Sequence, residues 1–95
     1  MENMSNKKQQ AVAIKYNNQS DTAPKVIAKG AGFIAEQILS TAKQHSVPVY
    51  QNKTLTSMLM AVDLDREIPA ELYQAVAEVL AYIYYIDKKM GNRRK

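Results

Sequence analysis

Short apolar runs alternate with polar clusters along the chain and predict its secondary structure. Residues 11–16 (AVAIKY) lie between polar stretches, as expected for a mostly buried strand. Apolar residues then recur with helical spacing over residues 27–42, and Pro24 suits the first turn of such a helix. The pattern predicts a strand followed by a long helix with Gly30 and Gly32 in its interior, where something packs closely against them.

The second half of the chain continues this order with shorter elements. Residues 47–50 (VPVY) and the alternating stretch 62–65 predict two short strands, and Thr54 can cap a short helix between them. A strong helical period occupies residues 69–91. Strands and helices thus alternate, which favours a small α/β domain whose three- to four-stranded, mostly parallel sheet is surrounded by helices.

Length and charge narrow the class of protein. Ninety-five residues form one domain, and 46% hydrophobic with 23% charged residues is ordinary for a globular chain. The net charge of +4 comes from the ends, because residues 10–87 carry six basic and eight acidic side chains. We expect a folded domain over residues 10–88, with flexible basic tails at residues 1–9 and 89–95. The folded part offers no basic surface for nucleic acid.

Cysteine content and hydropathy indicate the compartment. The chain has no cysteine, so it forms no disulfide and has no thiolate nucleophile or cysteine zinc site. Its apolar runs are far shorter than the roughly 20 residues that span a bilayer, and its first ten residues have no apolar core for a secretion signal. We therefore expect a cytoplasmic protein that does not insert directly into a membrane.

Two groups of residues could carry catalytic chemistry. His45 is the only histidine, and its neighbour Ser46 has no further residue that marks a nucleophilic triad. Asp63 and Asp65 fall on one face of the predicted strand, which is typical of a solvated edge rather than of a cation site. The sequence therefore predicts no catalytic residue, metal or cofactor. The alternatives are a small hydrolase that uses His45 or Asp63 and Asp65, or a small nucleic-acid-binding protein that uses the basic tails.

A third group, Lys29 with Gly30 and Gly32, has the composition of a phosphate-binding loop. Such loops bind phosphate through free N–H groups at the start of a helix. In the predicted helix from Pro24 these amides are already hydrogen-bonded, so helix packing is the favoured interpretation.

Four motifs carry a resemblance to a known family. They are residues 11–16 (AVAIKY), 23–32 (APKVIAKGAG), 47–48 (VP) and 67–82 (EIPAELYQAVAEVLAY). These motifs are similar to the cytoplasmic C-terminal domain of the FlhB/YscU export-switch family, which belongs to flagellar and type III secretion machines. The resemblance covers about residues 6–87, and its two longer motifs are specific when they occur together. Family members carry four transmembrane helices before this domain, so the chain resembles a stand-alone form of the domain.

The family's self-cleaving tetrapeptide, Asn-Pro-Thr-His, corresponds here to Asn6, Lys7, Lys8 and Gln9. Only the asparagine matches. The resemblance implies a degenerate site, because attack of the asparagine side chain on its own carbonyl is helped by the turn that proline permits. We expect no autocleavage. The family fold also places a strand before this motif, which residues 1–5 are too short and polar to supply, so an open edge is expected at the first strand.

The resemblance also implies a non-enzymatic role in protein export. Family members are thought to bind early export substrates in a small apolar pocket, which corresponds to Ala23, Pro24, Ala77 and Leu80. Without the resemblance, all four would be ordinary packing residues. The implied partners are flagellar export substrates, export-gate proteins and a membrane-anchored FlhB relative, at the cytoplasmic face of the flagellar export apparatus. No cofactor, nucleic acid or metal is implied.

Overall fold

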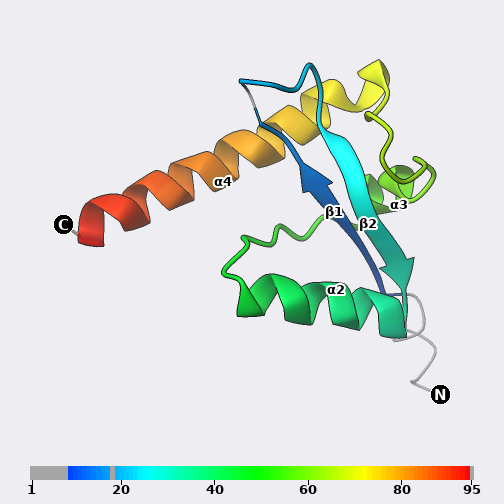
Figure 1. Cartoon of the computed structure of the whole chain (residues 1–95), viewed down its shortest axis with the longest axis horizontal. Coiled ribbons are helices and arrows are strands. Elements are labelled where there is room, and N and C mark those ends of the chain that lie inside the picture. Colours follow the sequence, from blue (N-terminus) through cyan, green and yellow to red (C-terminus); the bar gives the residue numbers. More distant parts are fainter. Residues whose placement is uncertain (1–8, 18, 95) are drawn as a thin grey trace.

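Two strands, a short 3-10 helix and three α-helices form the part of the chain that the structure describes (Figure 1). The computed structural model describes residues 9–17 and 19–94, with side chains up to residue 86. In chain order the elements are β1 (Gln10–Lys15), β2 (Lys25–Ala31), α2 (Phe33–Gln44), α3 (Lys53–Leu59), the 3-10 helix η1 (Ala70–Leu72) and α4 (Tyr73–Arg94).

The two strands pair antiparallel, with Gln10 opposite Ala31 at one end of the sheet. The prediction of a three- to four-stranded, mostly parallel sheet is therefore wrong for the described residues. The cause lies in the connection between the strands. The carbonyl oxygen of Asn17 accepts hydrogen bonds from the N–H groups of Ser20 (3.1 Å) and Asp21 (2.7 Å). This polar turn returns the chain directly, whereas a parallel pair needs a crossover of a dozen or more residues.

The helix predicted from Pro24 is wrong in its first part, because residues 25–31 form β2. The apolar spacing from Ile27 onward fits a helical period. However, the β-branched Val26 is fully buried and pairs with Ile14 of β1. Pairing between strands therefore prevails over the local periodicity in this segment.

Two glycines mark the junction of β2 and α2 and do not lie inside a helix. Gly32 precedes α2 with φ of 61°, a left-handed conformation that glycine adopts without strain. Gly30 pairs with Ala11, and a Cβ atom added to it would collide with Cβ and Cγ2 of Ile34 in α2. The close packing predicted at Gly30 is thus present, but it joins a strand to the helix that follows.

The other two predicted strands are also absent from the described structure. Residues 47–50 have no regular structure, and their apolar side chains are exposed. Residues 62–65 form a turn in which the N–H of Val62 donates to the carbonyl of Leu59 at 3.0 Å and Asp65 has φ of 65°. Of the two apolar residues in this stretch, Val62 packs against the core cluster whereas Leu64 is exposed, so the alternation does not separate a buried face from a solvated one.

The helical stripe predicted over residues 69–91 faces the core through Leu72 and Val76. Helix α3 is capped by Asn52, whose side chain accepts the N–H of Leu55 at 3.0 Å, and not by Thr54 as predicted. Buried residues of β2, α3, η1 and α4, with Ile68, form one cluster against which Val12 and Ile14 of β1 also pack. Its buried members are Val26, Leu55, Leu59, Ile68, Leu72 and Val76.

A short ladder of backbone hydrogen bonds joins the outer edge of β2 to the stretch before η1. Val26 donates its N–H to the carbonyl of Arg66 (3.1 Å) and accepts the N–H of Asp65 (2.7 Å). Ile68 donates to the carbonyl of Pro24 at 3.0 Å. The ladder brings Ile68 beside Val26 and sets the point from which α4 starts across the sheet (Figure 1).

Lys29 joins the same strand to the turn after α3. Its Nζ donates to the carbonyl oxygens of Met60 (2.8 Å) and Val62 (2.7 Å), which lie in the turn after α3. The side chain is partly buried, and hydrogen bonds from a charged group are stronger than those between neutral groups. One lysine therefore ties the end of α3 to the sheet.

The C-terminal part of α4 extends beyond the rest of the domain (Figure 1). One contact to this helix comes from the segment after α2, where the rings of Tyr50 and Tyr82 meet edge to face with centroids 5.5 Å apart. The helix continues to Arg94 and passes the predicted end at Gly91. The predicted N-terminal tail lies almost entirely outside the described residues, and the flexibility of residues 89–95 stays a prediction.

Gly30→Ala should lower the free energy of unfolding by about 1–3 kcal/mol, because the new methyl group overlaps Ile34. Urea denaturation measures the loss. Adding Ile34→Ala should recover part of the stability of the Gly30→Ala chain. The matched control is Gly32→Ala, where strain comes from the positive φ and nothing lies within 4 Å. Ile34→Ala should bring no recovery there, and equal effects in both chains would contradict the proposed contact.

Lys29→Met should destabilise the domain by about 2 kcal/mol, because two carbonyl groups lose a charged donor in a partly buried place. Lys25→Met, on the same strand but exposed, should change the free energy of unfolding by about 0.5 kcal/mol or less. Thermal and urea unfolding compare the two. Equal losses would show that the Lys29 hydrogen bonds add nothing to stability.

Candidate partner-binding site

Two of the four predicted pocket residues, Ala23 and Pro24, lie in the connection that leads from β1 to β2. Ala23 has only 2% of its surface exposed, and Pro24 is half-buried at the start of β2. The hydrogen bond from Ile68 to the Pro24 carbonyl connects this corner to the segment that leads into α4. The corner is therefore attached to that segment, and Ala23 itself belongs to the buried part of the molecule.

The other two predicted residues lie on α4 at positions i and i+3, which share one side of a helix. Leu80 is half-buried and packs against the core cluster, whereas Ala77 is exposed. Two open depressions of the described surface, one beside Asp63 and Asp65 and one beside Phe33, are lined by none of the four residues. The pocket thus stays a prediction, in which Ala77 is the member that a partner can reach directly.

The position of the degenerate cleavage motif is described only at its end. Asn6, Lys7 and Lys8 lie outside the described residues. Gln9 is exposed, and its carbonyl oxygen accepts the N–H of Gly32 at 2.8 Å. The beginning of β1 is therefore attached to the start of α2.

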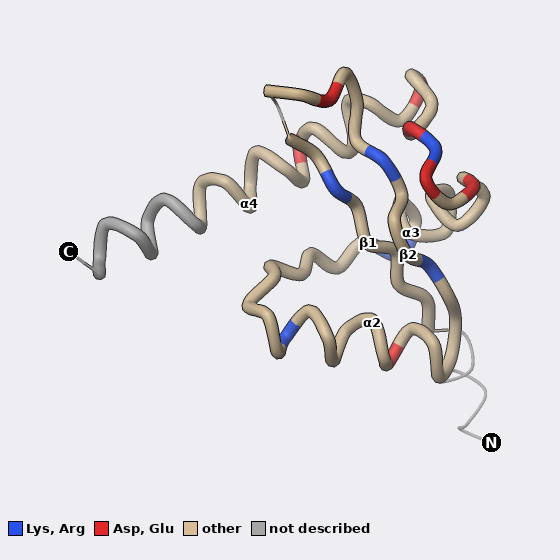
Figure 2. The backbone as a smooth tube through the Cα atoms, viewed as in Figure 1, with Lys and Arg blue, Asp and Glu red and all other residues tan. Residues whose placement is uncertain are grey.

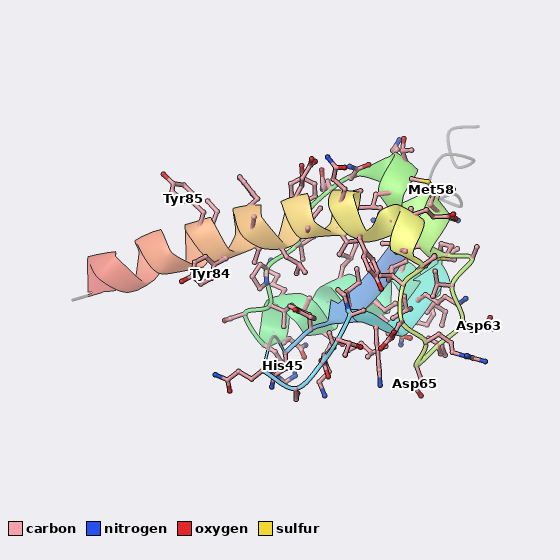
Figure 3. All side chains as sticks on the ribbon, turned by 90° about the horizontal axis from the view of Figure 1, so that it is seen from above. His45, Met58, Asp63, Asp65, Tyr84 and Tyr85 are labelled. Atoms are coloured by element: carbon pink, nitrogen blue, oxygen red, sulfur yellow. The ribbon has the colours of Figure 1, made fainter. Side chains whose placement is uncertain are left out.

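The residues of the hydrolase hypothesis lie at different ends of the domain. His45 follows the last turn of α2, whereas Asp63 and Asp65 lie in the exposed turn after α3 (Figures 1 and 3). In the described part of the chain, no three acidic or histidine side chains gather in a way that could hold a metal ion. The structure therefore does not bring these groups into one site.

The phosphate-loop hypothesis meets a different obstacle from the one in the sequence. Helix α2 begins at Phe33, so the glycines do precede a helix start. However, the N–H of Gly32 donates to Gln9, and the Nζ of Lys29 donates to the carbonyls of the turn after α3. The amide and the cation that would approach a phosphate are both engaged within the domain.

Charged residues of the domain body are intermixed (Figure 2). Lysines lie on both strands, while the turn that follows α3 carries Asp63, Asp65 and Glu67 around Arg66. Glu67 also accepts a hydrogen bond from the hydroxyl of Thr22 at 2.8 Å. This distribution does not favour binding of a polynucleotide backbone, which needs lysine and arginine side chains aligned along a surface.

Exposed apolar side chains are the surface feature that the sequence pattern misses. Phe33 at the start of α2 has 70% of its surface exposed, and Val49, Tyr50 and Tyr82 are also exposed. Phe33 lies off the apolar stripe of the helical period, and this is the one signal in the sequence that predicts its exposure. Because residues 47–50 look like a short strand in the sequence, the exposure of all their apolar side chains is not evident from the pattern.

Comparison with known proteins identifies the domain. Residues 4–83 match the sequence model of the FlhB HrpN YscU SpaS family. The chain belongs to this family. The resemblance seen in the sequence is confirmed, and the FlhB/YscU family serves flagellar biogenesis and type III protein export.

The relatives that match this FlhB/YscU domain include a short protein of similar length and much longer FlhB proteins. YlqH of Bacillus subtilis (strain 168), an uncharacterized protein, is 39% identical over 84 residues, which cover 88% of this chain and 90% of YlqH. The flagellar biosynthetic protein FlhB of Aquifex aeolicus is 43% identical over 81 residues, which cover 84% of this chain but 23% of that FlhB. The chain therefore spans less than a quarter of the FlhB protein that it matches.

Solved structures of the family share the fold. The cytoplasmic domain of FlhB from Shewanella putrefaciens has a TM-score of 0.83 at 34% identity, over 90% of this chain and 67% of that one. The PscU C-terminal domain has a TM-score of 0.76 at 32% identity, over 79% and 96% of the two chains. The mixed α/β fold is thus that of FlhB/YscU cytoplasmic domains. Within the described residues, no helix is both long and apolar enough to cross a membrane.

Ala77→Phe should leave the melting temperature almost unchanged, because the side chain at this position points to solvent. The matched control is Val76→Phe, at a neighbouring position with 1% exposure, which should lose about 1–3 kcal/mol through overpacking. If Ala77 belongs to a substrate pocket, its variant should also bind an export-substrate peptide more weakly, as measured by fluorescence anisotropy. Stability lost with binding retained would remove Ala77 from the pocket.

Proposed function

We propose that the chain is a non-enzymatic accessory of the bacterial flagellar export apparatus and acts at its cytoplasmic face. It presents an FlhB-like switch domain on which export substrates and export-gate proteins dock. It does so beside, or in place of, the same domain in a membrane-anchored FlhB relative. The observation that supports this proposal best is the likeness to the FlhB cytoplasmic domain, which extends over 90% of the chain in three dimensions.

Exposed apolar side chains support a docking role. Val47 and Val49 are about half exposed, and the edge-to-face pair of Tyr50 and Tyr82 joins their segment to α4. Aromatic side chains give much contact area for little loss of conformational freedom, which is why protein interfaces are rich in them. This surface, formed by residues 47–50 with Tyr82, is a suitable place for a protein partner.

A genetic test separates this function from an enzymatic one. In the bacterium that encodes the chain, FlhB is truncated to remove its own C-terminal domain, and the chain is then deleted or supplied. Supplying the chain should raise secretion of flagellar proteins and swimming motility, since it provides the missing docking domain. Immunoblots of secreted hook and filament proteins give the measurement.

Two controls complete this test. A His45→Ala chain should restore secretion as well as the unmodified chain, because the exposed His45 takes no part in docking by this proposal. A chain with Tyr50→Ser and Tyr82→Ser should restore it less. Secretion that is indifferent to the chain, or that is lost on His45→Ala alone, would contradict the proposed function.

A further inference from the structure

The connection from α2 to α3 is fixed at its two ends. At the first end the N–H of Val47 donates to a carbonyl of the last turn of α2 at 2.8 Å, and at the second end Asn52 caps α3. Residues 48–51 make no hydrogen bond with other described residues, but the ring of Tyr50 contacts that of Tyr82. The connection therefore has a defined course, although its middle makes few contacts with the domain.

Four apolar side chains on and beside this connection are exposed. Val47 and Val49 each have about half of their surface exposed, and the rings of Tyr50 and Tyr82 are exposed to a similar degree. None of the four belongs to the core cluster or to the side chains that pack against it. A group of exposed apolar side chains is typical of a surface that contacts another molecule. Packing within the domain does not account for these side chains, whereas a bound partner would.

The charged side chains along the connection are all basic. Residues 37–62, which contain most of α2, the connection and α3, include no aspartate or glutamate (Figure 2). They do include Lys43 in the last turn of α2 and Lys53 at the start of α3, both exposed, with His45 between them in the sequence. The other residues within 10–87 carry four basic and eight acidic side chains. The connection is therefore a locally basic region of a domain body that is otherwise acidic.

Helix α4 adds little net charge beside Tyr82. Glu78 and Asp87 are the acidic residues nearest to Tyr82 along this helix. Lys88 and Lys89 follow in the sequence of the same helix and equal the two acids in charge. The net positive charge near the four apolar side chains therefore comes from the two ends of the connection.

We propose that the surface formed by residues 47–50 with Tyr82 binds an acidic segment of a protein partner. The inference rests on the proposed function and deepens it, because it names the chemistry of the partner that docks there. In such a segment, apolar or aromatic residues contact the two valines and the tyrosine pair. Carboxylates on both sides of them meet Lys43 and Lys53 at the two ends of the connection. Attraction between opposite charges raises the rate and the specificity of such docking.

Other occupants fit this surface less well. A symmetric pair of two copies would bring two positively charged surfaces together, because each copy offers the same patch. The chain's own ends are basic too, with Lys7 and Lys8 near the first and five basic residues over 88–95. A polynucleotide would meet two lysines here, whereas its phosphates need many cations in line. An acidic polypeptide satisfies both the charges and the apolar side chains.

Two synthetic peptides of about 12 residues test the charge requirement on the full chain. Both have phenylalanine and leucine in the middle, and these are flanked on each side by glutamates in one peptide and by lysines in the other. Amide chemical shifts in NMR spectra detect weak binding and locate it. The glutamate peptide should shift the amides of Val49, Tyr50 and Tyr82. It should also bind at least about tenfold more tightly than the lysine peptide.

Charge reversal on the chain supplies the second test. Lys43→Glu with Lys53→Glu should weaken binding of the glutamate peptide at least about tenfold and make the lysine peptide the tighter ligand. The matched control is Lys25→Glu with Arg66→Glu, because both side chains are exposed and the net charge changes equally. The control chain should bind the glutamate peptide within about twofold of the unmodified chain, since distant exposed charges are screened. The peptide comparison on the unmodified chain decides the matter even if a reversed chain does not fold.

Three peptide results would overturn the inference: equal binding of the two peptides, no shift at the connection with either of them, or equal losses in the reversed and control chains. A chain that is dimeric by light scattering and slow to exchange the amides of Val49 and Tyr50 would also overturn it, because a second copy then occupies the surface. If secretion in the truncated FlhB strain still depends on the chain, the proposed function stands although this inference fails. Loss of both would reject the proposed function as well.

Discussion

The structure depends on the short ladder between the start of β2 and residues 65–68. A two-stranded sheet alone has too little apolar surface to be stable. The ladder places Ile68 beside Val26, and Lys29 holds the end of α3 against the same strand. Helices α3 and α4 can then cover Val12 and Ile14 and complete the core. The sheet is stable because a loop substitutes for the missing third strand on one side.

The sequence predicts those parts of the fold that depend on interactions between residues close together along the chain. The apolar stripe predicted over residues 69–91 depends on neighbours three and four residues apart, and its members Leu72 and Val76 are buried as their spacing indicates. The identity of β2 depends on β1, which lies beyond a turn. A helical period that begins at Ile27 therefore misled the prediction for residues 25–31. The close packing expected at Gly30 is present, but Gly30 lies in a strand and not in a helix.

The site was less predictable than the fold, because exposure depends on which surfaces remain after packing. Motifs in residues 23–32 and 67–82 identified the FlhB/YscU family, and the family match confirms it. They did not show that Ala77 faces solvent while Ala23 is buried, since both are small residues in apolar surroundings. The exposure of Tyr50 likewise has no clear sign in the pattern, whereas Phe33 lies off the apolar stripe of its helix.

Strand β1 is connected to the core by two of its side chains. Val12 and Ile14 both pack on the core cluster, so the backbone of this strand and the core are held together. A partner that bound to the folded domain beside this strand would immobilise the backbone that presents the two side chains, so binding and folding stability would be coupled. A ligand that binds only the folded form stabilises it in proportion to the logarithm of its concentration over Kd. Binding at such a place would therefore also raise the free energy of unfolding.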